Sequence, residues 1–149
     1  MRWVAQARWL IATLWVGSIW TVGYLVAPTL FATLHDRALA GTVAGSLFRV
    51  EAWVSVVCAG LLLLLMMLSV DASQTMRQRR SLFLLIAGML ACTVVSHFGL
   101  QPLMADLRAT SQGIMNDAVK AQFGMLHGIS SGIYLVQSLL GIALILKIR

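Results

Sequence analysis

Two histidines are the residues whose position in this sequence best suits chemistry, because both fall inside long apolar runs. His97 lies about five residues, and His127 about six, from the same end of its run, so at 1.5 Å per residue both lie roughly 8–10 Å below one membrane surface. An ionisable side chain within a membrane span is costly and therefore indicates a function.

Two imidazoles at one depth in a helical bundle suit several kinds of chemistry. They could ligate haem b axially, form half of a copper or zinc site, or carry protons. Further ligands for copper are His35, in a polar connector, and the sulfur atoms of Met104 and Met125. The competing interpretation is that each histidine only hydrogen-bonds a neighbouring hydroxyl or backbone carbonyl.

Polar residues recur at helical spacing around these histidines. In lipid, helices associate through small and polar residues, so such stripes are predicted to face inward. They form a predicted polar seam that includes Glu51, Thr93, Gln101, Ser131 and Tyr134. Plain helix packing is the competing explanation for each stripe.

Two further features concern the surroundings of the seam. Glu51 heads its apolar run, and we expect it to contact Arg108 or Lys120 or to approach the histidines. Small residues at every fourth position predict a face for helix packing, made of Gly124, Gly128 and Gly132.

The composition of the chain indicates whether water or lipid surrounds these residues. The chain has 149 residues, of which 60% are hydrophobic and 11% charged, whereas a soluble domain carries roughly 25% charged residues. A chain this short cannot bury so much apolar surface in water. We therefore predict a single membrane domain over residues 1–149, an all-α polytopic four-helix bundle.

Four runs are long enough for a span, which needs about 20 residues. They are Trp9–Leu34, Val50–Val70, Leu82–Leu103 and Ala121–Leu146. The segments His35–Arg49 and Met104–Lys120 are predicted as connectors, the latter with one amphipathic turn.

The formal charge of +6 does not indicate nucleic acid, because the basic residues sit at the ends of apolar runs. One side of the predicted bundle holds seven of them: Arg2, Arg8, Arg77, Arg79, Arg80, Lys147 and Arg149. The other side holds four: Arg37, Arg49, Arg108 and Lys120. The positive-inside rule then predicts that both termini lie in the cytoplasm.

The two halves of the sequence are weakly alike. Pro28 and Pro102 each lie in an out-going run, and Phe48 and Phe123 follow them at nearly equal separations. This pattern predicts a duplicated helical hairpin, with two parallel repeats about an axis along the membrane normal.

Several segments carry a family resemblance. The segments 14–20, 27–31, 40–48 and 123–130 resemble the bacterial membrane family similar to transmembrane protein 205. That resemblance implies a four-helix protein of a bacterial inner membrane. A more distant similarity to copper-resistance D-type and haem-binding four-helix membrane proteins implies haem or copper at His97 and His127.

Three functions follow as hypotheses. The first is a bundle that binds haem b or copper, with a role in electron transfer or in haem or metal handling. The second is a non-catalytic subunit, in a homo-oligomer or a larger membrane complex, packed through the glycine face. The third is a small channel or transporter along the polar seam. The sequence has no HExxH, no GxSxG and no glycine-rich phosphate loop, and it leaves open whether the chain is an enzyme.

Overall fold

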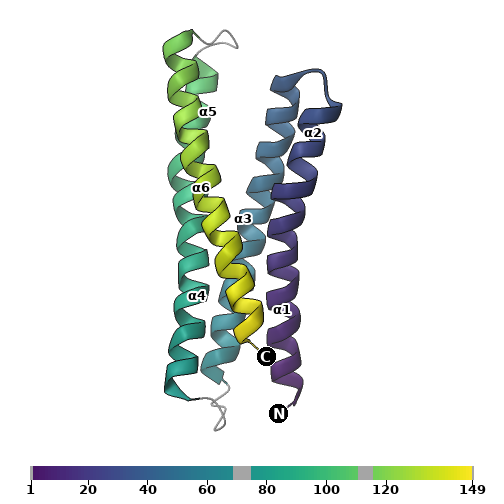
Figure 1. Ribbon diagram of the computed structural model, residues 1–149, viewed down its shortest axis with the longest axis vertical. Coiled ribbons are helices and arrows are strands. Elements are labelled where there is room, and N and C mark those ends of the chain that lie inside the picture. The colour runs from purple at the N-terminus through teal and green to yellow at the C-terminus, as the bar shows by residue number, and fades with distance from the viewer. Residues whose placement is uncertain (1, 69–74, 111–115, 149) are drawn as a thin grey trace.

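The structure is a computed structural model, and it describes residues 2–68, 75–110 and 116–148. Over these ranges four long helical rods run alternately in opposite directions (Figure 1). Each rod is long and apolar enough to cross a membrane, which confirms the predicted all-α, four-helix membrane architecture. Both chain ends lie at one end of the bundle, which we call the terminal end; the opposite end is the distal end.

Two of the rods are continuous helices and two are interrupted. The second and fourth rods are α3 (Arg37–Leu68) and α6 (Asp117–Lys147). The first consists of α1 (Arg2–Trp20), the π-helix η1 (Thr21–Val26) and α2 (Ala27–Thr33). The third consists of α4 (Met76–Val94), the π-helix η2 (Val95–Leu100) and α5 (Gln101–Thr110).

The helices extend further toward the distal end than the apolar runs predict. α3 already begins at Arg37, so the predicted connector over 35–49 is wrong for residues 37–49. Asp36 explains this start, because its Oδ1 accepts the N–H groups of Ala38 and Leu39 at 2.8 and 3.1 Å. In the other predicted connector, helix continues to Thr110 and resumes at Asp117, and residues 111–115 lie outside the described part.

Side-chain caps also define the starts of the two helices of the second half. Thr75 and Gln78 form a reciprocal capping box at the start of α4. Asn116 accepts the N–H of Val119 at 2.9 Å at the start of α6. These polar residues end the connectors and fix where each apolar helix begins.

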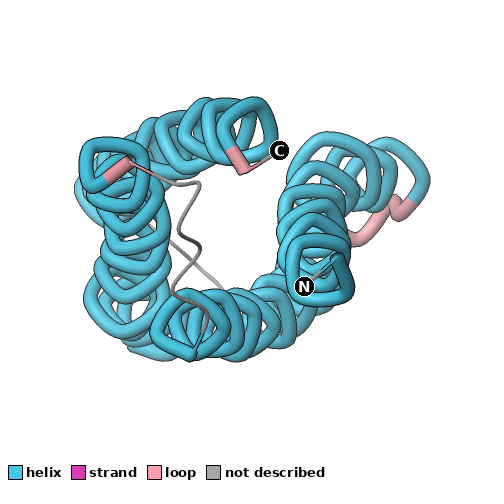
Figure 2. Tube along the Cα trace, turned by 90° about the horizontal axis from the view of Figure 1, so that it is seen from below, coloured by secondary structure: helices cyan, strands magenta, loops and turns pink. Residues whose placement is uncertain are grey.

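The rods form a ring in the order α1, α3, α4, α6 (Figure 2). α1 packs on α3 and α6, and α4 packs on the same two helices. Two helical hairpins result, α1 to α3 and α4 to α6.

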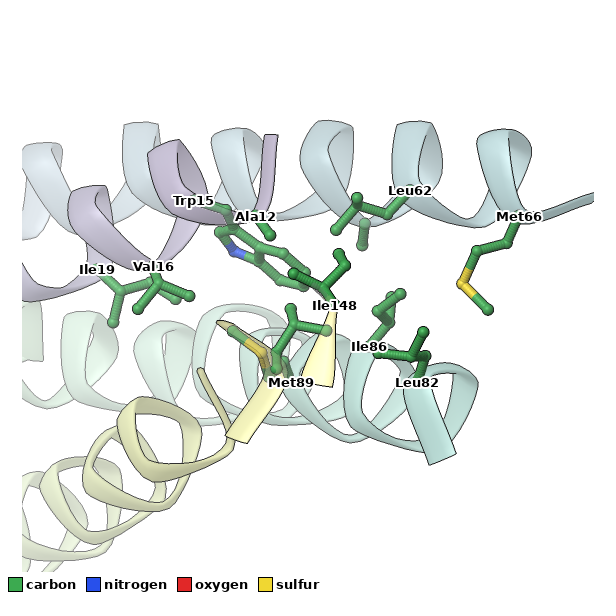
Figure 3. Packing of buried hydrophobic residues seen from close by; sticks show 12 residues of the cluster. Ala12, Trp15, Val16, Ile19, Leu62, Met66, Leu82, Ile86, Met89 and Ile148 are labelled. Carbon is green, nitrogen blue, oxygen red and sulfur yellow. The ribbon is translucent and has the colours of Figure 1, made fainter. Parts of the chain in front are cut away.

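The hydrophobic core occupies the terminal half of the bundle. Figure 3 shows Trp15 and Met89 pointing toward each other among aliphatic side chains from the other helices. The buried cluster comprises Ala12, Trp15, Val16, Ile19, Ala59, Leu62, Met66, Leu82, Ile86, Met89, Leu144 and Ile148. This packing closes the terminal half with side chains from all four helices.

Toward the distal end the two hairpins diverge (Figure 1). There α2 packs on α3 and α5 packs on α6, and the hairpins touch where α3 meets η2 and where Tyr134 of α6 meets Gly23 and Phe48. The bundle is thus packed at one end and split at the other.

The two π-helices occur at equivalent positions of the two hairpins. Each has six residues and ends two residues before a proline, Pro28 or Pro102. A proline has no N–H and crowds the carbonyl of residue i−4, and the wider turn before it accommodates this. The N–H groups of Ala27 and Gln101 bond to Val22 and Ser96, five residues back. This recurrence supports the predicted duplication.

Candidate functional site: a cavity between the two hairpins

A cavity of about 520 Å³ lies between the hairpins in the distal half of the bundle. Its inner end is marked by Glu51 on α3 and by Thr93 and Gln137 on α4 and α6. Gly41 and Arg108 line it nearer the distal end. Ten residues separate Gly41 from Glu51 along α3, so the cavity extends over about 15 Å of the bundle axis.

The two walls of the cavity differ in chemistry. The first hairpin contributes mostly small, aromatic and apolar residues: Gly23, Tyr24, Ala27, Pro28, Phe31, Gly41, Ala44, Gly45, Phe48, Glu51 and Ala52. The second contributes mostly polar residues: Thr93, Ser96, His97, Gln101, Met104, Arg108, His127, Ser130, Ser131, Tyr134, Leu135 and Gln137. A ligand that fits both walls has an apolar face and a face with hydrogen-bonding groups.

A chain of hydrogen bonds links the core to the inner end of the cavity. The indole N–H of Trp15 donates to Ser55 Oγ at 2.7 Å, and the Ser55 hydroxyl donates to Glu51 Oε1 at 2.8 Å. All three residues are buried. This chain holds the Glu51 carboxyl group at the boundary between the packed core and the cavity.

Two further interhelical contacts lie at the same level. Gln137 Nε2 donates to Thr93 Oγ1 at 2.9 Å, which joins α6 to α4. Tyr24 Oη donates to Ser138 Oγ at 3.0 Å, which joins η1 to α6. Polar side chains thus satisfy one another in the layer where the hydrophobic core ends.

Tyr134 anchors α6 against the first hairpin. Its hydroxyl donates to the carbonyl oxygen of Ile19 at 2.5 Å. Its ring lies edge-on to Tyr24 and to Phe48, with centroids 6.0 and 5.5 Å apart. We call Tyr24, Phe48 and Tyr134 the aromatic cluster. All three residues also line the cavity.

Both π-helices contribute to the cavity lining through Gly23, Tyr24, Ser96 and His97. Single π turns are frequent at functional sites, because they rotate side chains out of the regular helical phase. The hydroxyl of Ser96 is buried and has no hydrogen-bond partner among the described residues. It can therefore bond to a molecule that enters the cavity.

The predicted seam residues all lie at this cavity. Glu51, Thr93, Gln101, Ser131 and Tyr134 line it, as do His97 and His127. Both histidines belong to the second hairpin, on η2 and α6, which are neighbours.

Of the sulfur and histidine ligands predicted for copper, one lies with these histidines. Met104 is buried and lines the cavity. His35 and Met125 do not line it, and the Met125 side chain is exposed. In the described ranges, three or more His, Cys, Asp or Glu side chains do not gather as a metal site would require.

The predicted contacts of Glu51 with the basic residues are not formed. Glu51 is bonded to Ser55, whereas Lys120 lies 3.8 Å from Asp117. The Arg108 guanidinium lies over the Phe123 ring, 4.8 Å from its centroid. The reason is distance along the helices, because Glu51 is about 15 Å deeper than the level at which Arg108 approaches Gly41.

The glycine face does not pack against another helix of the described residues. Gly124, Gly128 and Gly132 are exposed, and a Cβ added at any of them would meet no atom within 4 Å. A close approach of helices occurs instead at Gly23, where an added Cβ would overlap the Tyr134 ring.

Some cavity residues had only an indirect signal in the sequence. Arg108 lies beyond the apolar part of its run, and only the continuation of helix to Thr110 brings it to the cavity. Phe48 and Ser96 resemble ordinary packing residues in sequence. Trp15 is a core residue whose link to Glu51 depends on Ser55 from another helix.

A comparison with known protein families identifies the family of this chain. The domain of unknown function DUF4149 matches residues 10–112, about two thirds of the sequence. The chain belongs to this family. The match spans most of the first rod and all of the second, and it extends through the third, whereas α6 lies outside it. Neither a curated protein nor a solved structure matches the chain.

Proposed function

We propose that this DUF4149 protein is a membrane-embedded binding protein whose ligand is a small amphipathic molecule held in the cavity. The observation that carries the proposal is the contrast between the two walls around about 520 Å³ of space. That volume lies within the roughly 300–1,000 Å³ typical of small-molecule sites. The buried core in the terminal half would keep the ligand in the distal half of the bundle.

Gly45 allows a direct test, because it lines the cavity and a Cβ added there meets no atom within 4 Å. Gly45→Leu should fill the space without disturbing helix packing. Gly17→Leu is the matched control, since Gly17 is exposed, has the same free surroundings and does not line the cavity.

Native mass spectrometry of the detergent-purified chain measures the outcome. We expect the wild type and Gly17→Leu to carry a small molecule from the membrane, and Gly45→Leu to lack it. Identical spectra for the three proteins would contradict the proposal.

Haem b is a second candidate for the bound molecule. Copper is a third, because the same side chains could hold it. The supporting observation is that His97 and His127 line one cavity, with Met104 beside them on the lining. His97 and His127 would hold the iron or copper, and the bound group would supply one-electron chemistry.

An optical spectrum and metal analysis test this candidate. A Soret band, or stoichiometric copper, that is lost in both His97→Ala and His127→Ala would support it. A colourless, metal-free wild type would exclude it. The resemblance to the transmembrane protein 205 and copper-resistance families stays a prediction, because the family match, to DUF4149, does not test it.

We further propose that the chain lies in a bacterial inner membrane with the terminal end in the cytoplasm. The support is the excess of basic residues at that end, such as Arg77, Arg79 and Arg80. The cavity then lies in the half of the bilayer that faces the periplasm. Reporter fusions at the two ends of the chain, and insertions after Leu34, test the orientation.

A further inference from the structure

Glu51 is the only carboxylic acid among the described residues that line the cavity. It is 5% exposed and accepts a hydrogen bond from Ser55. No described lysine, arginine or histidine lies within ion-pair distance of it. An uncompensated charge within a membrane is costly, so this carboxyl group either keeps its proton or receives a cation from outside the chain.

Aromatic rings lie beside this carboxyl group. Phe48 precedes Glu51 by three residues on α3, so the two share one side of the helix. Tyr134 packs edge-on against Phe48 at an angle of 87° between the ring planes, and Tyr24 packs against Tyr134. The faces of phenyl and phenol rings attract cations, most strongly where water is excluded.

On the first hairpin, which carries Glu51, the cavity wall favours an organic cation over a metal ion. The wall formed by the first hairpin is apolar apart from Glu51 and the Tyr24 hydroxyl, and it offers a metal ion few oxygen or nitrogen ligands. The guanidinium of Arg108 lines the cavity about 15 Å nearer the distal end. A cation with a hydrophobic body and a dispersed charge loses little hydration when it enters and gains contact with the apolar wall.

We propose that the cavity binds a hydrophobic organic cation whose charged centre lies between the Glu51 carboxylate and the aromatic cluster. This inference rests on the proposed function and names the chemical class of the ligand. The Trp15–Ser55–Glu51 hydrogen-bond chain serves to hold the carboxylate toward that centre.

Two probes of the same shape and opposite charge test the inference. Binding of tetraphenylphosphonium and of tetraphenylborate to the full chain in maltoside micelles is measured by equilibrium dialysis. We expect saturable binding of the phosphonium at one site per chain, and no saturable binding of the borate. Gly45→Leu should abolish the phosphonium binding.

Glu51→Gln removes the charge and preserves the size and the acceptor for Ser55. We expect it to weaken phosphonium binding about tenfold or more. Glu51→Asp, which keeps the charge, should retain part of the affinity. Asp106→Asn is the control, since Asp106 is an exposed carboxylate that does not line the cavity.

The outcomes distinguish a failure of the cation inference from a failure of the proposed binding function. If both probes bind, Gly45→Leu blocks both, and Glu51→Gln binds the phosphonium like the wild type, then the cavity is a binding site but not a cation site. If neither probe binds to the folded wild type, the cation inference fails. Thermal unfolding of each variant confirms that it is folded before its binding is compared.

Discussion

Gly23 lies directly against the ring of Tyr134, so closely that a Cβ on Gly23 would overlap the ring. This contact is where the first and fourth rods approach each other at the cavity. It also places the Tyr134 hydroxyl within hydrogen-bond distance of the Ile19 carbonyl. One glycine therefore sets the position of the aromatic cluster.

Gly23→Ala should displace Tyr134 and break its bond to Ile19. We expect a loss of about 1–3 kcal/mol in the free energy of unfolding, from overpacking and the lost hydrogen bond. Thermal or denaturant unfolding in detergent measures it. Gly17→Ala in the same rod is the control, because its Cβ meets nothing within 4 Å, and equal stability of the two variants would contradict the contact.

Ser55→Ala should be strongly destabilising for so small a change. It removes the acceptor of the Trp15 indole N–H and the donor to Glu51, and all three residues are buried. A buried polar group left without a partner costs about 1–3 kcal/mol.

Ser46→Ala provides the comparison, since Ser46 is exposed on the same helix and bonds only to the Thr42 carbonyl. Unfolding of both variants is followed by tryptophan fluorescence. An unchanged unfolding curve for Ser55→Ala would show that the hydrogen-bond chain contributes nothing to stability.

Much of this fold could be predicted from the sequence, because every rod that crosses lipid must be apolar over the length of its span. Apolar length fixed the number of helices, and polar stripes indicated which sides face inward. Glu51, His97 and His127 were thus predicted to face inward; all three line the cavity, although His127 is also exposed. Helix ends could not be placed from apolarity, because caps such as Asp36 extend α3 into a polar segment.

The geometry of the site depends on structural features that no periodic pattern in the sequence indicates. The π turns before Pro28 and Pro102 alter the helical phase, and no residue type in η1 or η2 marks them. The split between the hairpins depends on which pairs of helices pack at the distal end. Small residues at four-residue spacing did not indicate the packing within the chain, because Gly128 is exposed while Gly23, outside any such stripe, makes a close contact.

Gly128 offers a test of the predicted oligomer. Gly124, Gly128 and Gly132 form an exposed stripe on α6, where a second membrane helix could approach closely. We propose a second copy of the chain as that partner. Gly128→Leu should then reduce the mass measured by light scattering in detergent to that of the monomer.

Gly60→Leu is the control for this change, since Gly60 is an exposed glycine on α3 with equally open surroundings. An assembly of unchanged mass in Gly128→Leu would exclude this face as the interface.

The bond between Gln137 and Thr93 predicts an energetic coupling between α6 and α4. Both side chains are buried, and the amide donates to the hydroxyl at 2.9 Å. A double-mutant cycle of Gln137→Leu and Thr93→Val should give a coupling of about 0.6 kcal/mol, the average for hydrogen bonds between membrane helices. Denaturant unfolding in mixed micelles measures the four proteins.

Thr93→Val combined with Ser131→Ala should be additive, because Ser131 bonds to the His127 carbonyl of its own helix. A coupling of zero in the first cycle would mean that apolar packing alone joins the two helices at this level.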